Sequence, residues 1–350
     1  MSGHKKAVFL GSVKIGGGAA PVVQSMTSTQ THDIEATLEQ IKRLFDAGCE
    51  VVRVAVPDQK ALTALPEILK ECPMPLVADI HFDYRLAIGA IEAGADGIRI
   101  NPGNIGNEER VKRVIEAARK RNVPIRIGVN SGSLPREILD EFEKPGARAM
   151  VKTMEKHVSF FENNDYTNIK LSLKSTDVLE TIAANREASK RFPYPLHLGL
   201  TEAGTLRRGI VNSAAALTPL LLDGIGDTLR ISLTEDPVEE VRVAWDLLGA
   251  LKIKRRGLNI FSCPTCGRCQ IDLEGLVKQV EKETAGIEKK LDIAIMGCVV
   301  NGPGEAKEAD LGIAGGKNKG VIFAKGKKLA SYPYSELLPV LLKKIEEYDG

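Results

Sequence analysis

The sequence has 350 residues, of which 43% are hydrophobic and 27% charged, a globular composition with room for a large domain and an appendage. The formal net charge of +2 and the aromatic content of 5% argue against a nucleic-acid-binding protein. The first residues lack the apolar core of a signal peptide, and apolar runs such as SAAALTPLLL are too short to span a membrane. Six cysteines without a disulfide framework favour a reducing, cytoplasmic setting.

A short hairpin, AVFLGSVKIGG, is the first expected element. From residue 20 to about 250, short β-rich runs alternate with helical stretches that are apolar at helical spacing, such as DIEATLEQIKRLFDAG. The expected strands are PVVQSM, CEVVRVAV, PLVADIHF, GIRINPG, PIRIGVN, NIKLSLK, PLHLGLT and TLRISLT. These eight strand–helix units predict an α/β fold, a closed parallel (β/α)8 barrel of the TIM type over residues 1–252. A doubly wound open sheet is the alternative, but it would not require eight units.

Polar side chains interrupt strands that should be apolar on both faces in an all-parallel barrel. Several recur at a spacing of two, such as Arg230 with Ser232, which places both on one face near the end of the strand. Barrel enzymes have their active sites at the carboxyl ends of the strands. The candidate site residues are Arg53, His81, Arg99, Arg126, Asn130, Lys174, Glu202, Arg230 and Ser232.

The charges in this set do not balance. Five cations on the strands face only two acids, Asp79 and Glu202. A buried excess of cations is costly unless an anion meets it, so we expect an anionic ligand. The planar fork of arginine suits phosphate oxygens, which favours a phosphate or diphosphate. The alternative is a ring of internal salt bridges.

A basic connector, LKIKRRG, leads to a smaller α+β unit expected over residues 257–350. Strands are expected at LNIFS, LDIAIMG, LGIAG and GVIFAKG, with helices near residues 273–284 and at SELLPVLLKKIEEY. The stretch CPTCGRC follows the first of these strands and Cys298 follows the second. The two loops would be neighbours if the strands pair.

Cysteines at this spacing indicate a metal but do not name it. A structural zinc site of four cysteines and a [4Fe–4S] cluster both fit Cys263, Cys266, Cys269 and Cys298. Glu305 lies behind a Gly-Pro-Gly turn and could return as a hard, exchangeable ligand, which would favour a site that meets substrate. The alternative is a surface glutamate.

The stretches VQSMT, LVADIHFDYR, RINPGNIGNEER, PIRIGVNSGSL, HLGLTEAG, CPTCGR and MGCVVNGPGEA closely resemble the 4-hydroxy-3-methylbut-2-enyl diphosphate synthase family of the non-mevalonate isoprenoid pathway. The resemblance runs from about residue 8 to residue 348 in the same order, and it matches the compact bacterial form.

The resemblance implies a [4Fe–4S] iron–sulfur cluster held by Cys263, Cys266, Cys298 and Glu305, with Cys269 outside the ligand set. It implies an oxidoreductase that opens the ring of 2-C-methyl-D-erythritol 2,4-cyclodiphosphate with electrons from reduced flavodoxin or ferredoxin. The matching cations and polar residues of the barrel would hold the diphosphate, and Glu202 would lie beside the reacting carbons as the candidate proton donor.

A homodimer is expected from geometry and from the resemblance. The eighth strand ends at the catalytic mouth, and the helix after it must run back toward the other end of the barrel. The second unit therefore starts away from the cations that it should serve. A two-fold pair in which each cluster domain caps the partner's mouth solves this problem. The alternative function is a non-redox phosphosugar or pteridine-type barrel enzyme with a structural zinc domain.

Overall fold

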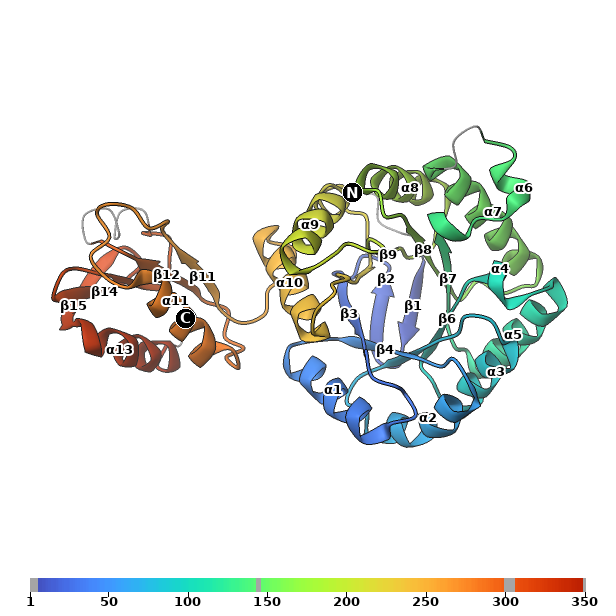
Figure 1. Ribbon diagram of the computed structural model, residues 1–350, viewed down its shortest axis with the longest axis horizontal. Helices are drawn as coiled ribbons and strands as arrows, with labels where there is room; N and C mark the ends of the chain where they lie inside the picture. The colour runs from blue at the N-terminus through green and yellow to red at the C-terminus, as the bar shows by residue number, and fades with distance from the viewer. Residues whose placement is uncertain (1–5, 143–145, 299–305, 349–350) are drawn as a thin grey trace. The chain divides into compact units, whose positions relative to one another are not determined.

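The computed structural model describes residues 6–142, 146–298 and 306–348. The chain divides into two compact units, Met1–Lys254 and Arg255–Gly350, and the division falls between the two ranges expected from the sequence. Each unit has its own hydrophobic core. Figure 1 shows a ring of strands and helices in the first unit and a smaller layered sheet in the second.

The first unit is a parallel barrel, as predicted. Its strands are hydrogen-bonded in the order β8-β7-β6-β5-β4-β3-β10-β9, and a parallel bridge between Leu171 and Leu196 joins the two ends of this series. The strands are β3 (Val22–Met26), β4 (Val51–Ala55), β5 (Leu76–Asp79), β6 (Gly97–Ile100), β7 (Ile125–Asn130), β8 (Ile169–Lys174), β9 (His197–Leu198) and β10 (Thr228–Leu229). The last two are shorter than the sequence indicates, so Glu202, Arg230 and Ser232 lie in the loops that follow them.

Helices cover the outside of the ring (Figure 1). Their apolar stripes, such as Ile41 and Leu44 on the first helix, are buried against the strands. Aspartates at several amino ends, including Asp33, Asp58 and Asp236, accept a backbone N–H and so define where the helix starts. The helices are α1 (Ile34–Asp46), α2 (Gln59–Glu71), α3 (Tyr84–Ala93), α4 (Pro102–Ile105), α5 (Glu108–Arg121), α6 (Arg136–Leu139), α7 (Ala147–Asn163), α8 (Val178–Arg191), α9 (Leu206–Leu222) and α10 (Pro237–Ala250), with a 3-10 turn at Ser131–Ser133.

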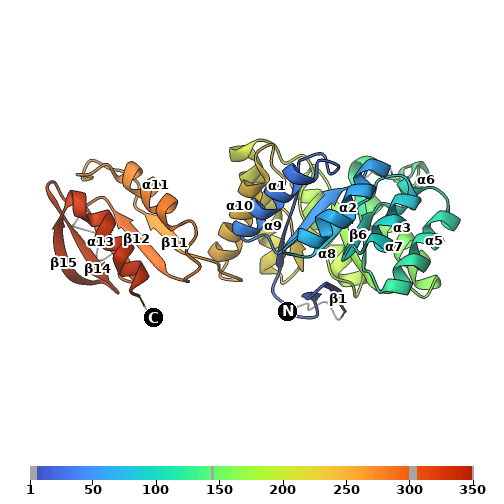
Figure 2. The ribbon, with the colours of Figure 1, turned by 90° about the horizontal axis from the view of Figure 1, so that it is seen from below.

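A hairpin precedes the barrel, as expected, and closes one end of it. Strands β1 (Ala7–Leu10) and β2 (Val13–Gly16) pair antiparallel. Val8, Leu10 and Ile15 of the hairpin form a buried cluster with Val22, Val51 and Val77, which lie at or near the amino ends of β3, β4 and β5. Figures 1 and 2 show the hairpin across the ring at that end. The barrel is therefore open only toward the carboxyl ends of its strands.

The second unit is a five-stranded sheet with two helices on one face. The strands are β11 (Asn259–Ser262), β12 (Asp292–Met296), β13 (Leu311–Ala314), β14 (Lys319–Ala324) and β15 (Lys327–Pro333), and the helices are α11 (Leu273–Thr284) and α13 (Tyr334–Glu346). The first three strands are parallel, and the last two are antiparallel to their neighbours. The sequence did not indicate β15, whose exposed residues begin with two lysines.

Candidate active site

Four cationic side chains of the barrel strands converge inside the ring. Arg53, Arg99, Arg126 and Lys174 are between 4% and 8% exposed. The strands place them in register: Arg99 pairs with Arg126 on β6 and β7, and Asn130 pairs with Lys174 on β7 and β8. Paired residues of neighbouring strands share one face, so these side chains point into the barrel together.

Asp79, at the end of β5, neutralises two of these cations. Its Oδ1 lies 3.0 Å from Nη1 of Arg99, and its Oδ2 lies 3.5 Å from Nε of Arg53. Burial alone would raise the pKa of the Asp79 carboxyl, but Arg53 and the neighbouring donors outweigh burial and lower this pKa. Asp79 is thus a fixed negative charge inside the barrel.

Arg230 has an acid of its own that the sequence did not indicate. Its Nε and Nη2 each donate to one carboxylate oxygen of Glu240 at 2.9 Å. Glu240 lies on α10 and is 2% exposed. The sequence predicted Asp79 and Glu202 to be the two acids that face the five cations. The second of these was wrong: Glu240 is the buried acid that pairs with Arg230, and Glu202 is exposed.

The structure also adds a cation. Lys170 lies on β8 opposite Arg126 and is 3% exposed. Its Nζ, and Nε and Nη1 of Arg126, have no hydrogen-bond partner among the described residues. Unpaired buried donors of this kind are costly unless a ligand or water accepts from them.

The electrostatics of the ligand-free site reflect this excess. Burial, followed by repulsion from Arg126 and Arg53, lowers the pKa of Lys174 well below its usual value. Burial and then Arg53 and Arg99 do the same to the pKa of Arg126. A bound anion would oppose both shifts, because it stabilises the charged forms. The arrangement therefore has the excess charge and the unpartnered donors that an anionic ligand would need.

Two glycines make room for the cations. A Cβ on Gly199 would lie 2.5 Å from Nζ of Lys174, and a Cβ on Gly128 would lie 3.2 Å from Nε of Arg99. Side chains at these positions would displace the charged groups. The absence of a side chain at these two positions therefore leaves space for the charged groups.

The remaining predicted residues lie at the open end. His81 joins the buried group through Nε2, which is 3.3 Å from Nη1 of Arg99 and 3.6 Å from Oδ2 of Asp79. Asn130, the last residue of β7, and Ser232, in the loop after β10, are both half-buried. Glu202 is exposed in the loop after β9, with a left-handed φ of 52°. A non-glycine residue held in that conformation is often part of a functional site. No contact that the structure describes joins Glu202 to the cations.

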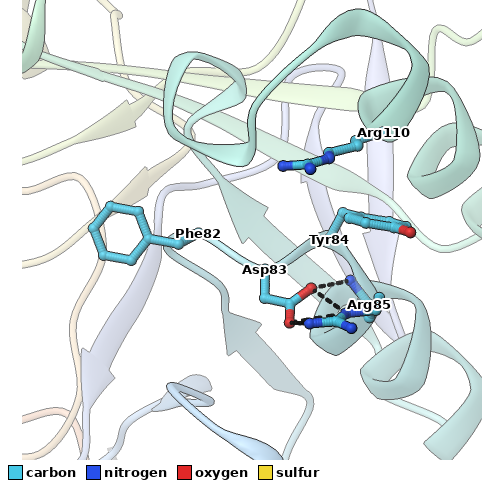
Figure 3. Close-up of a pocket in the computed structure, with 5 residues that line it drawn as sticks. All are labelled: Phe82, Asp83, Tyr84, Arg85 and Arg110. Carbon is cyan, nitrogen blue, oxygen red and sulfur yellow. Dashed lines mark hydrogen bonds and ion pairs between the residues drawn. The ribbon is translucent and has the colours of Figure 1, made fainter.

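A surface hollow of about 380 Å³ lies beside the open end, in the loop after β5. Figure 3 shows its lining residues, Phe82, Asp83, Tyr84, Arg85 and Arg110. Arg85 pairs with Asp83 at 2.7 Å, and the guanidinium of Arg110 lies 5.8 Å from the centre of the Tyr84 ring. Phe82 is 72% exposed.

The cysteine loops of the second unit lie side by side, as expected. Strands β11 and β12 pair in parallel, so Cys263 and Cys298 follow neighbouring strand ends. Sγ of Cys263 accepts a hydrogen bond of 3.3 Å from the backbone N–H of Gly297. A Cβ on Gly297 would lie 2.6 Å from Sγ of Cys269. Cys266 is exposed, and Glu305 lies outside the described residues.

Two features are absent from the described residues. No group of three histidine, cysteine or acidic side chains in 6–142, 146–298 and 306–348 is close enough to hold a metal ion. In the same ranges no helix is both long and apolar enough to cross a bilayer.

Comparison with known proteins decides the family. Residues 5–245 match the GcpE TIM-barrel domain, and residues 259–347 match the GcpE protein C-terminal domain. The chain belongs to the GcpE family. A relative from Geobacter sulfurreducens is 52% identical over 99% of this chain and 98% of its own length, and one from Caldanaerobacter subterraneus subsp. tengcongensis is 55% identical over 98% and 96%. Both are named 4-hydroxy-3-methylbut-2-en-1-yl diphosphate synthase (flavodoxin).

The barrel of this GcpE-family chain also resembles solved dihydropteroate synthases. The enzyme from Yersinia pestis aligns with a TM-score of 0.51 and 11% identity, covering 70% of this chain and 97% of that one. The enzyme from Xanthomonas albilineans gives a TM-score of 0.52 and 13% identity over the same shares. At such low identity the likeness extends to the fold alone.

Proposed function

We propose that this GcpE-family chain reduces 2-C-methyl-D-erythritol 2,4-cyclodiphosphate to (E)-4-hydroxy-3-methylbut-2-enyl diphosphate. The reaction takes up two electrons and two protons, opens the ring and releases water. The observation that carries the proposal is the buried cation excess around Arg126 and Lys174, in a chain more than half identical to relatives with that name. Those names specify flavodoxin, so a non-redox enzyme with structural zinc is not favoured.

In this proposal the barrel cations hold the diphosphate before any chemistry. Arg53, Arg99 and Arg230 already have fixed geometry through Asp79 and Glu240, so they present their remaining donors without reorganising. Arg126 and Lys174 supply the charge that the fold leaves unbalanced. His81, Asn130 and Ser232 would frame the rest of the substrate at the open end.

Glu202 is the proposed proton donor to the departing hydroxyl. It is the carboxylic acid that follows β9 at the carboxyl end of the barrel, and its exposure leaves it accessible to substrate. Its backbone has a left-handed φ of 52°, a conformation that non-glycine residues adopt only occasionally.

Cys263, Cys266, Cys298 and Glu305 are the proposed ligands of a [4Fe–4S] cluster. Soft thiolates from two adjacent loops suit iron–sulfur chemistry, and the N–H of Gly297 that donates to Cys263 is a contact of the kind that tunes such clusters. When bound, the cluster would supply the reducing equivalents. Cys269 donates to the backbone carbonyl of Ile271 at 3.3 Å, which gives its thiol a structural partner outside the ligand set.

Flavodoxin is the proposed electron donor and a homodimer the proposed working unit. Lys254, the last residue of the barrel unit, donates to the carbonyl of Pro21 at 3.3 Å and to Oε1 of Glu50 at 2.6 Å. Both partners lie just before β3 and β4, so the chain leaves the barrel at its closed end. Nine further residues to Cys263 span at most about 32 Å when fully extended, and four of them form β11. Because the chain leaves at the closed end, we expect the open mouth, where Phe82 is exposed, to be covered by the cluster domain of the partner chain.

Anaerobic purification tests the proposal. Iron and sulfide in about equal amounts, with little zinc, should accompany turnover of the cyclodiphosphate with dithionite as the reductant. Zinc without visible absorption, or a loaded protein that leaves the cyclodiphosphate unchanged, would overturn it.

A further inference from the structure

The cysteine end of the second unit carries three cations that form no ion pair with any described residue. Strands β11, β12 and β13 are parallel, so their carboxyl ends lie together at one edge of the sheet. Cys263, Cys298 and Gly315 follow these strand ends. The turn after β13 is tied to the cysteine loop, because the N–H of Lys317 donates to Oε1 of Gln270 at 2.9 Å. The N–H of Gln270 in turn donates to the carbonyl of Gly297 at 3.2 Å.

Arg268, Lys317 and Lys319 are all exposed at this edge. In the part of the chain that the structure describes, none of their side chains pairs with a carboxylate. Other cations of the unit do pair: Arg255 with Asp292 at 3.1 Å, and Lys278 with Glu274 at 2.6 Å. Asp272, the acid nearest in sequence to Arg268, uses Oδ1 to cap α11. The positive charge of these three residues, the cysteine-edge patch, is therefore available to a partner.

The opposite edge of the same sheet offers an internal comparison. Lys325, Lys327 and Lys328 are also exposed, and β14 separates them from the cysteine end. Five residue steps of strand, from Lys319 to Ala324, correspond to roughly 17 Å. The two groups have the same charge and differ in their distance from the cysteines.

We infer that the cysteine-edge patch docks an acidic one-electron carrier of the flavodoxin class. The inference rests on the proposed function and names the surface that its electron donor uses. Electrons must reach the cysteine loops from outside the protein. A carrier can bind at the edge where those loops lie while the cluster domain is withdrawn from the partner's barrel mouth. Each turnover needs two reduced carriers, each oxidised by one electron, so docking must be brief as well as oriented. Charge complementarity speeds such encounters without making a lasting complex.

The test compares two triple variants of the holoenzyme. In the first, Arg268, Lys317 and Lys319 are changed to Gln, and in the matched control Lys325, Lys327 and Lys328 are changed to Gln. Turnover is measured with a reduced bacterial flavodoxin and, separately, with dithionite. Binding of the same flavodoxin is measured by titration at low and at high salt.

The first variant should raise the apparent KM for flavodoxin by about tenfold, weaken flavodoxin binding and flatten its salt dependence. The control should change each by less than about twofold. Dithionite-driven turnover and the dimer should be unaffected in both. Equal effects of the two variants, or none from the first, would overturn the inference.

A loss of dithionite-driven turnover in the first variant would also overturn it, since the patch would then serve the substrate or a second copy of the chain. Failure of the proposed function would give a different result from failure of this inference, because the unaltered protein would then not convert the cyclodiphosphate with dithionite.

Discussion

Arg230 and Glu240 form a two-point ion pair in which both hydrogen bonds measure 2.9 Å. The carboxylate also accepts from Oγ of Ser25 at 2.8 Å and from the N–H of Leu233 at 3.1 Å. One buried acid on α10 therefore connects β3, the loop after β10 and the guanidinium at the barrel mouth. It orients a cation that the proposed substrate would need.

Replacing this acid tests that role. Glu240→Gln should lower the free energy of unfolding by about 3 kcal/mol, because it leaves Arg230, whose side chain is only 18% exposed, without a countercharge. The KM for the cyclodiphosphate should rise as Arg230 loses its orientation. Glu239→Gln is the control on the same helix: its partner Arg242 is 58% exposed, so the cost should stay below about 1 kcal/mol. Denaturant unfolding of both variants checks the contrast, and equal losses would contradict it.

Replacement of Arg126 should increase the stability of the ligand-free protein and weaken its binding of anions. Its Nε and Nη1 are unpartnered among the described residues, and its neighbours are cations. Arg126→Met should raise the free energy of unfolding of the ligand-free protein by at least about 1 kcal/mol, because a buried unpaired charge disappears. The same variant should lose most affinity for inorganic pyrophosphate, measured by calorimetry.

Arg53→Met is the comparison for Arg126, because Arg53 is paired with Asp79 at 3.5 Å. It should give no gain in stability. A stability gain in Arg53→Met as large as that in Arg126→Met would show that countercharge does not decide the effect.

His197 predicts how stability depends on pH. It is fully buried, with Nδ1 2.8 Å from Oγ1 of Thr228. Burial, and then Arg126 and Lys174, lowers the pKa of this histidine well below its usual value. In the unfolded chain a histidine has a pKa of about 6.5. As the pH falls below about 6.5, the unfolded chain binds a proton that the folded protein refuses, so stability decreases.

His197→Gln should reduce this decrease. Denaturant midpoints of the variant and the unaltered protein, compared between about pH 7 and about pH 5, isolate the contribution of this one histidine. Parallel curves for the two proteins would mean that His197 binds a proton as readily in the folded protein as in the unfolded chain.

Three of the clustered cysteines should be cluster ligands, and Cys269 should not. Cys263→Ser, Cys266→Ser and Cys298→Ser should each lose the brown chromophore and most of the iron. Cys269→Ser should retain both, because its thiol contacts the carbonyl of Ile271. Iron analysis and visible spectra check this without an activity assay. Loss of the cluster in Cys269→Ser together with its retention in Glu305→Ala would reverse the assignment of these two residues.

Mixed dimers test whether the active site joins two chains. Arg126→Ala and Cys298→Ser should each be inactive alone. When the two are co-expressed, one site of each mixed dimer combines an intact barrel with an intact cluster domain, so activity should return. Mixed dimers that form but remain inactive would mean that each chain uses its own cluster.

The sequence predicted the barrel because hydrophobic periodicity and strand spacing are local signals. It predicted Arg53, Arg99, Arg126 and Lys174 as inward-facing because the outer face of a barrel strand packs against helices, where a charged side chain would meet only apolar groups. Their register on neighbouring strands, and the burial of all four, followed from that fold.

Pairing across the fold was not predictable in the same way. Glu240 looks like an ordinary acid in the first turn of a helix, since the packing of α10 beside β3 is not written in its local sequence. Lys170 lies four residues before Lys174 and could have been recognised by the same alternation. Strand β15 was missed because it is exposed and its lysines are typical of a sheet edge rather than of a core strand.

The hairpin at the closed end of the barrel leaves the site with a single opening. Val8, Leu10 and Ile15 seal the amino ends of the strands, so nothing passes through the ring. A molecule that leaves must use the opening by which the next one arrives, and two diphosphates cannot occupy the same cations. Product should therefore inhibit in competition with substrate, and any domain that covers the mouth must withdraw at least once in every cycle, so that product leaves before the next substrate enters by the same opening.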